Sequence, residues 1–333
     1  MNRRTFIHLG LGAVGASLLG GCAVGLTGAS AGGGGAAGAG AKGAWDAAAF
    51  HAARRFVPTS FGEIAYVERG SGPVALLLHG FPLNGFQWRG VMAELAPHRR
   101  CIAPDWLGLG YTRVAEGQSV APDAQVGMLI AFLDKLGIDQ VDVIANDSGG
   151  QAAQLLVAAH PERVRSLLLT NCDTEIDSPP PAVLPVIEAA RRGRFALDTF
   201  PPQLADHEFA RSDKGIGVLC FTYPQHPSDE AIETYFRPLV ESPQRVRLTD
   251  AYAIGLDPNP LAGVAATLKQ RDLPVRILWG TGDTIFTPAA PEYLDKLFPN
   301  SRGVRKIEGA KLFFPEEFPQ EIAAEALKLW SGA

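Results

Sequence analysis

Short apolar runs alternate along this chain with stretches in which apolar residues recur at helical spacing. The runs are typical of strands buried on both faces of a parallel sheet. They predict strands at 74–78, 100–105, 141–145, 164–169, 275–279 and 304–307. Helical spacing predicts helices at 126–136, 149–159 and 316–330. Strands that alternate with helices predict an α/β fold, with a doubly wound and mostly parallel sheet.

One long interruption separates the last two predicted strands from the others. Residues 174–258 are rich in proline and in amphipathic helical stretches, and no strand is predicted there. Its position favours a helical cap inserted over the sheet, where it would shield a pocket from water. The core is then expected to consist of residues 55–173 and 259–333.

The amino terminus has the features of an export signal. Arg3 and Arg4 precede an apolar stretch, residues 9–19, that is too short to span a membrane. The pair of arginines predicts the twin-arginine route, with residues 1–21 as the signal peptide. Leu19-Gly20-Gly21-Cys22 resembles a lipobox, which would make Cys22 the lipidated first residue. The alternative is a plain cleaved signal with Cys22 near the cut.

Residues 22–54 are dominated by glycine and alanine, so they predict a flexible tether. Cleavage before Cys22 would leave 333 − 21 = 312 residues and, by removing two arginines, change the formal charge from −5 to −7. This acidic excess argues against nucleic acid as a partner. The predicted location is the periplasm, or its membrane through a lipid on Cys22.

The remaining cysteines do not predict a metal site. Cys101, Cys172 and Cys220 are far apart and lack the spacing of metal ligands. Cys101 and Cys172 are expected to be buried, and no cofactor is expected.

Residues 146–150, Asn-Asp-Ser-Gly-Gly, follow a predicted strand and open a predicted helix. That context suits a nucleophile elbow, in which the nucleophile sits on a tight turn between small residues. With Asp147 as the nucleophile, the flanking residues are Ala145, Gly149 and Gly150. With Ser148 as the nucleophile, two of the three flanking residues are too large. The steric argument therefore favours Asp147.

Four motifs, in this order and spacing, resemble the α/β-hydrolase superfamily over residues 56–330. They are His79-Gly80-Phe81-Pro82, Ala103-Pro104-Asp105-Trp106-Leu107-Gly108-Leu109-Gly110, Asn146-Asp147-Ser148-Gly149-Gly150 and Trp279-Gly280-Thr281-Gly282-Asp283. An aspartate at the elbow is similar to the haloalkane dehalogenase and epoxide hydrolase branch. The resemblance implies that an aspartate attacks carbon to form an ester, which a histidine-activated water then hydrolyses.

The resemblance also implies individual roles. Asp147 matches the nucleophile, and the backbone N–H groups of Phe81 and Ser148 match the oxyanion hole. Asp283 matches the catalytic acid, although an aspartate that caps a turn would look the same, and Asp173 is a second candidate acid. His79 matches a structural histidine beside the oxyanion hole.

The segment from Gly309 to Pro319 departs from the family pattern at one position. In the family a histidine precedes the phenylalanine that matches Phe313, whereas this chain has Leu312. No histidine follows His226, so this segment cannot supply an imidazole base. His207 and His226 lie in polar, proline-flanked stretches of the cap, where surface positions are expected.

Two further departures concern the substrate. Ser148 replaces the tryptophan that dehalogenases place directly after the nucleophile, and Phe81 occupies the variable position of the His-Gly-x-Pro motif. Epoxide hydrolases use two cap tyrosines, but spacing selects no pair among Tyr223, Tyr235 and Tyr252. The mainly apolar cap suggests a small apolar substrate or ligand.

Three hypotheses follow for the activity. The first is a hydrolase for haloalkanes, epoxides or esters that uses Asp147 and a rearranged base. The second is a pseudoenzyme that binds a small apolar molecule. The third is a protein that traps such a molecule as a stable ester, because loss of a general base slows turnover by about 10²–10⁴-fold.

Overall fold

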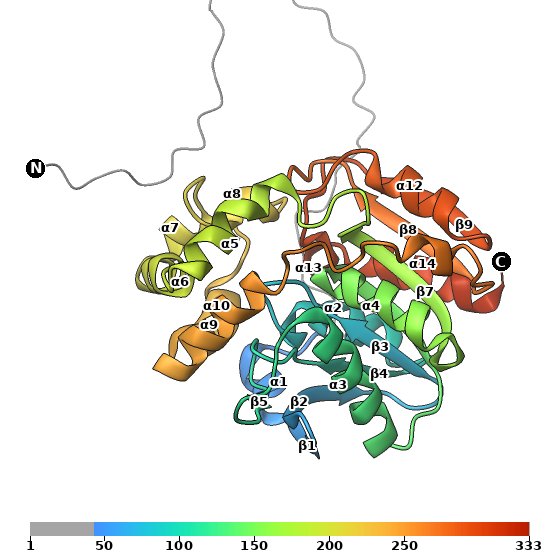
Figure 1. Ribbon diagram of the computed structural model, residues 1–333, viewed down its shortest axis with the longest axis horizontal. Coiled ribbons are helices and arrows are strands. Elements are labelled where there is room, and N and C mark those ends of the chain that lie inside the picture. The colour runs from blue at the N-terminus through green and yellow to red at the C-terminus, as the bar shows by residue number, and fades with distance from the viewer. Residues whose placement is uncertain (1–42, 333) are drawn as a thin grey trace, which may run out of the picture. The chain divides into compact units, whose positions relative to one another are not determined.

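The computed structural model describes residues 43–332, and a nine-stranded sheet forms its centre (Figure 1). The strands are β1 (Arg55–Thr59), β2 (Gly62–Arg69), β3 (Val74–Leu78), β4 (Arg100–Pro104), β5 (Arg113–Val114), β6 (Val141–Asp147), β7 (Val164–Cys172), β8 (Val275–Gly280) and β9 (Ser301–Ile307). Their order is β1-β2-β4-β3-β6-β7-β8-β9, and β5 pairs with β2. All pairs from β4 to β9 are parallel, which confirms the predicted mostly parallel sheet.

The first strands differ from the rest, because β2 pairs antiparallel with β1, β4 and β5. The sequence analysis predicted no strand before Val74. The strand β2 contains four consecutive buried residues, Ile64 to Val67, and so lacks the alternation that would mark a strand with one solvated face.

Helices cover the sheet in two sets. The core helices and 3₁₀ turns are α1 (Ala47–Ala52), η1 (Gly85–Trp88), α2 (Arg89–Leu95), α3 (Pro122–Lys135), α4 (Ser148–Ala159), η2 (Pro161–Arg163), α11 (Ala265–Leu268), α12 (Ala290–Leu297), α13 (Phe314–Glu317) and α14 (Pro319–Ser331). Helix α3 packs on α4, and α2 packs on α14. Every residue of β3 and β6 is buried, as expected for strands covered on both faces.

Two boundaries differ from the prediction. Residues 316–330 form two helices, because Pro319 begins α14 and disfavours a helical backbone at Phe318, which has φ −125° and ψ 50°. The expected tether, residues 22–54, includes α1, in which Phe50 is buried and makes an edge-on contact with the ring of Phe86. The folded part therefore begins before residue 55, because one aromatic side chain gives this alanine-rich segment a contact with the core. Residues 22–42, with Cys22, and the expected signal peptide lie outside the described residues.

Between β7 and β8 the chain is helical. This segment contains η3 (Pro181–Val183), α5 (Leu184–Arg191), α6 (Phe195–Ala205), α7 (His207–Arg211), α8 (Ile216–Cys220), α9 (Asp229–Val240) and α10 (Pro243–Ile254). Figure 1 shows α5 to α10 gathered to one side of the sheet. Packing of α6 on α9 and of α5 on α10 makes them a helical layer of their own.

Within residues 43–332, no helix combines the length and apolar character needed to cross a bilayer. Cys101 and Cys172 are buried and unbridged, as predicted, and so is Cys220.

Candidate functional site

The turn between β6 and α4 has an unusual backbone at Asp147. Its φ is 55° and its ψ is −131°, and it is the one residue other than glycine with a positive φ in the described part of the chain. An L-residue adopts this conformation only under strain, and such strain is concentrated at functional sites. Ser148 is the first residue of α4, so the sharp bend lies at Asp147 and not at Ser148.

The glycines around this turn are required by close packing. A Cβ atom on Gly149 would lie 2.3 Å from the carbonyl oxygen of Leu78, and one on Gly150 would lie 2.4 Å from the Cβ atom of Cys172. A Cβ atom on Gly80 would lie 2.6 Å from the Cβ atom of Asp147. The turn therefore packs against both the end of β3 and the end of β7, which leaves no room for larger residues.

Two backbone amides hold one oxygen of the Asp147 carboxylate. The N–H of Phe81 donates to Oδ1 at 2.8 Å, and the N–H of Ser148 donates to the same oxygen at 2.6 Å. These are the two amides that the sequence resemblance assigned to an oxyanion hole. Both of these backbone hydrogen bonds go to Oδ1 and not to Oδ2.

Burial raises the pKa of Asp147 to about 6, against the opposing effect of the two amide donors, and the charge of Asp283 adds to the rise. At pH 7 the carboxyl group is still mostly ionised. Because it is desolvated, it is a stronger nucleophile than an exposed carboxylate.

Asn146 connects the turn to three other parts of the sheet edge. Its side-chain oxygen accepts from Gln87 at 2.7 Å, and its amide nitrogen donates to the hydroxyl of Thr170 at 2.9 Å. The same nitrogen donates to the carbonyl oxygens of Asn171 at 3.1 Å and Leu312 at 3.0 Å. The C-terminal segment is thus attached directly to the residue that precedes Asp147.

Leu312 itself is 3% exposed, and Phe313 donates its backbone N–H to the carbonyl oxygen of Cys220 at 2.9 Å. A Cβ atom on Gly80 would lie 3.0 Å from the ring of Phe313. The segment therefore lies against the turn and against the loop that carries Phe81.

The two candidate acids lie at the ends of adjacent strands. Asp283 follows β8, and its carboxylate accepts from the side-chain amide of Asn171 at 2.9 Å and from the backbone N–H of Ile285 at 2.8 Å. Burial raises the pKa of Asp283. Asp173 follows β7 and accepts from the hydroxyl of Ser178 at 2.9 Å. Burial and the charge of Asp147 raise the pKa of Asp173 to about 8, so this group is largely protonated at pH 7.

His79 is fully buried beside the loop that carries Phe81. Its Nδ1 donates to the carbonyl oxygen of Gly80 at 2.9 Å, and its Nε2 accepts from the backbone N–H of Trp106 at 3.3 Å. Burial lowers the pKa of His79 to about 4, so the ring is neutral and both nitrogens are occupied. It shapes this turn and has no nitrogen free for a substrate.

The two cap histidines contact other residues than Asp147. His207 lies near the surface and pairs with Asp229 at 3.1 Å. His226 differs from the expectation of a surface position, because its ring stacks on Phe221 and its buried Nδ1 lies 3.8 Å from a carboxylate oxygen of Glu316. The rings of Phe221 and Tyr223 both lie beside this imidazole, and the pattern of polar neighbours in the sequence did not indicate these contacts.

Tyr252, on α10, is the cap tyrosine that reaches the turn. Its hydroxyl lies 3.0 Å from Oγ of Ser148, and its ring stacks on Phe81 with centroids 5.3 Å apart. Tyr235 instead donates to Glu316 at 2.5 Å, and Tyr223 stacks on Phe318. Spacing could not select Tyr252, because the cap determines which tyrosine faces the sheet.

A cavity of about 10 Å³ lies beside Ser148 and Tyr252, which is room for about one water molecule. Its walls are Val120, Pro122, Gln125, Ser148, Gln151, Ala152, Tyr252 and Leu256. This cavity is too small to hold an organic molecule.

Known proteins resemble this chain over most of its length. Haloalkane dehalogenase 2 of Mycobacterium tuberculosis (strain ATCC 25618 / H37Rv) is 28% identical over 293 residues, covering 82% of this chain and 93% of the relative. Epoxide hydrolase 3 of Siraitia grosvenorii is 29% identical over 289 residues, covering 77% and 90%.

Solved structures share the fold. The epoxide hydrolase CorEH without ligand matches with a TM-score of 0.67 and 22% identity, over 84% of this chain and 98% of that structure. A thermophilic esterase from Thermogutta terrifontis matches with a TM-score of 0.64 and 23% identity, over the same shares. A sequence model described as the α/β hydrolase fold matches residues 73–318. The chain belongs to the α/β hydrolase fold family, with haloalkane dehalogenase-like and epoxide hydrolase-like relatives.

Proposed function

We propose that this protein is a hydrolase in which Asp147 attacks a small apolar substrate of the haloalkane, epoxide or ester type. The observation that carries the proposal is the Asp147 carboxylate on a strained turn, with Oδ1 held by two backbone amides. With a haloalkane, Oδ2 forms a bond to carbon while the carbon–halogen bond breaks and its electron pair leaves with the halide. With an epoxide, Oδ2 forms a bond to one ring carbon while that carbon's C–O bond breaks, and the oxygen, which keeps the electron pair, takes a proton from water.

The second half of the reaction uses the same two amides. Water attacks Cγ of the ester, negative charge develops on Oδ1, and the N–H groups of Phe81 and Ser148 stabilise that charge. The attacking water must lose a proton. We propose that Leu312 occupies the position of the family's histidine, so that this proton has no imidazole to accept it. Asp283 matches the catalytic acid, which in the family orients the histidine. Here its carboxylate accepts a hydrogen bond from the side-chain amide of Asn171 instead.

The second candidate function, capture of a ligand without turnover, is favoured by this same pair of residues. An aspartate can form the ester without a base, but hydrolysis without one is slower by about 10²–10⁴-fold. The two candidates therefore differ only in the lifetime of the ester.

Intact-protein mass spectrometry tests the proposal. The full chain is incubated with a panel of bromoalkanes, aryl epoxides and nitrophenyl esters, and both product and protein mass are followed. We expect product, or a mass increase that peptide mapping assigns to Asp147, and we expect both to vanish in Asp147→Asn. Asp139→Asn, an exposed loop position, is the matched control. Product or adduct that persists in Asp147→Asn at the wild-type rate would overturn the role of Asp147.

We also propose that residues 1–21 direct export by the twin-arginine route and that Cys22 carries lipid. The support is the sequence Arg3-Arg4, the apolar stretch after it and the lipobox-like Leu19 to Cys22. Fractionation of cells that express the wild type and Cys22→Ser tests the anchor. The variant should move from the membrane to the soluble periplasmic fraction, and an unchanged distribution would reject lipidation.

A further inference from the structure

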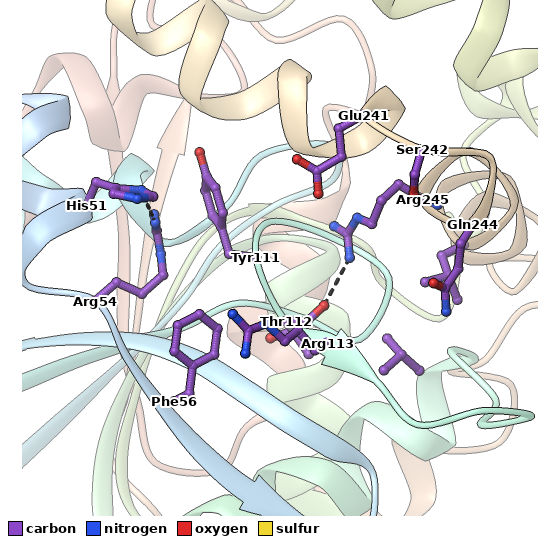
Figure 2. Close-up of a pocket in the computed structure, with 12 residues that line it drawn as sticks. His51, Arg54, Phe56, Tyr111, Thr112, Arg113, Glu241, Ser242, Gln244 and Arg245 are labelled. Carbon is purple, nitrogen blue, oxygen red and sulfur yellow. Dashed lines mark hydrogen bonds between the residues drawn. The ribbon is translucent and has the colours of Figure 1, made fainter.

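The larger of the two cavities described for this protein does not lie at the turn of Asp147. It has a volume of about 450 Å³, which is within the range of small-molecule sites. Residues from the end of α1, from β1 and β5, from the loop before β5 and from the start of α10 line it (Figure 2). None of its lining residues belongs to the turn or lines the small cavity beside Ser148. A ligand in this cavity would therefore bind at a site separate from Asp147.

Arg245 is a buried cation on this cavity and is 9% exposed. Its Nε donates to the carbonyl oxygen of Pro238 at 2.8 Å, its Nη1 donates to that of Thr112 at 2.9 Å, and its Nη2 donates to that of Gly110. A guanidinium has five N–H groups, so two remain. No carboxylate of residues 43–332 lies within 4.0 Å of it, although buried arginines are ordinarily paired.

Arg54 is a second cation without a carboxylate partner among the described residues. Its guanidinium lies 3.5 Å from the centroid of the Tyr111 ring and contacts Nδ1 of His51. Burial and the charge of Arg54 lower the pKa of His51, so this ring is neutral at pH 7. In the view of Figure 2, Tyr111 lies between Arg54 and Arg245.

The third arginine of the lining, Arg113, is partly compensated. It lies over the ring of Phe56 at 4.4 Å and pairs with Glu63 at 2.9 Å. Glu241 is the single carboxylate among the lining residues, against three guanidinium groups. Guanidinium groups therefore outnumber carboxylates among the lining residues, although Glu63 and the buried Asp105 offset part of this charge from behind the lining.

Apolar surface lies next to these charges. Phe56, Val114 and Leu248 line the cavity together with the ring of Tyr111. Phe56 is 37% exposed, so part of its ring is available to a ligand. The start of α10, a twelve-residue helix with Ser242 as its N-cap, also faces this cavity and adds the positive end of a helix dipole.

We propose that this cavity binds a small organic anion, with a carboxylate or phosphate head group on Arg54 and Arg245 and an apolar body against Phe56 and Leu248. Guanidinium groups bind both head groups through paired N–H donors, and partial desolvation strengthens such bonds. The two remaining N–H groups of Arg245 then donate to the head group, since the nearby carboxylates of Glu241 and Asp105 act on this guanidinium without forming an ion pair with it. Glu241 opposes the anion, so it weakens binding and disfavours doubly charged ligands.

Titration of the full chain with benzoate and with phenyl phosphate, at constant ionic strength, tests the proposal by calorimetry and by changes in melting temperature. Benzamide, which is uncharged, serves as the matched probe. We expect saturable binding of at least one anion and none of benzamide. The two anions distinguish a carboxylate site from a phosphate site.

Two variants with opposite expected signs make the test specific. Arg54→Gln should weaken binding of the anion by about tenfold or more, because it removes a charged donor without disturbing a backbone contact. Glu241→Gln should strengthen binding, by about twofold to fivefold, because it removes the opposing charge. Arg245→Gln is less informative, since Arg245 also ties three backbone carbonyls together.

Arg192→Gln, an exposed arginine at the C-cap of α5 that pairs with Glu188, is the control for a general loss of positive charge and should leave binding unchanged. The proposal is overturned by absence of saturable binding of either anion up to about 10 mM. It is equally overturned if benzamide binds as well as benzoate, or if Arg54→Gln and Glu241→Gln leave the affinity unchanged.

Discussion

The turn at Asp147 and the segment from Gly309 to Pro319 lie against one another, yet they differ in the side chains that they present. The turn has a strained backbone and a carboxylate, with φ 55° at Asp147 and two amides on Oδ1. In the C-terminal segment the backbone is in place, since the carbonyl oxygen of Leu312 accepts from Asn146 at 3.0 Å, but the side chain at 312 is aliphatic.

The difference shows that the contacts that hold a segment in place and the side chains that a reaction needs are separate requirements. Asn146, Cys220 and Gly80 hold residues 312 and 313 through backbone atoms and ring contacts, which do not depend on the side chain of residue 312. A buried leucine at position 312 satisfies those demands. If residue 312 is the position of the family's histidine, as we propose, the fold tolerates the loss of that base.

The largest expected effect comes from restoring the imidazole. Leu312→His should raise the rate of ester hydrolysis by about 10²–10⁴-fold, because water gains a general base beside Asp147. The rate of ester hydrolysis is measured by mass spectrometry as the rate at which the covalent adduct disappears. Leu329→His, a buried position on α14 away from the turn, controls for the burial of a histidine. No gain in Leu312→His on any substrate would mean that residue 312 is not the position of the base.

The pH dependence of ester formation tests the turn alone, because this step involves Asp147 and not the C-terminal segment. The pKa of Asp147 is raised to about 6, and only the ionised carboxylate attacks carbon. The rate of adduct formation should therefore be flat above pH 7 and fall by about 100-fold between pH 7 and pH 4. Stopped samples analysed by mass spectrometry give the profile, and circular dichroism checks that the fold persists. A midpoint near pH 4 would indicate an exposed carboxylate and contradict the burial of Asp147.

Glycine substitutions compare the packing of the two regions directly. Gly149→Ala should lower the free energy of unfolding by about 3 kcal/mol, because its Cβ atom would lie 2.3 Å from a backbone oxygen of Leu78. Gly309→Ala should cost only about 1 kcal/mol, because its φ is 72° but no atom lies within 4 Å of the new Cβ. Urea unfolding measures both, and equal losses would contradict a turn held by tighter packing.

The last expected effect is on the slope of stability against pH, and its size depends on how wide a pH range is measured. Asp173 has a pKa of about 8 in the folded protein and about 3.9 when unfolded, so the folded state binds the extra proton between these values. The free energy of unfolding should fall as pH rises through this window, by up to about 1.4 kcal/mol per pH unit for this group. Asp173→Asn should remove that contribution and flatten the curve between pH 5 and pH 8. An unchanged slope would show that Asp173 ionises normally in the folded protein.

The sequence by itself determined the parallel part of the sheet and the turn after β6. Apolar runs indicate strands covered on both faces, because such strands exclude polar side chains. Small residues indicate a strained turn, because such a turn excludes large side chains. The same local reasoning marked Leu312, since the residues on either side of it keep the family's spacing.

Tertiary structure decided what depends on residues far apart in the chain. Tyr252 reaches Ser148 across 104 positions, and Asn146 reaches Leu312 across 166. The antiparallel strand β2, the burial that raises the pKa of Asp147 and the cavity around Arg245 likewise arise from packing between distant segments. The pattern of apolar residues within a segment does not indicate such contacts. That pattern shows which face of the segment is buried, but not which other segment packs against that face.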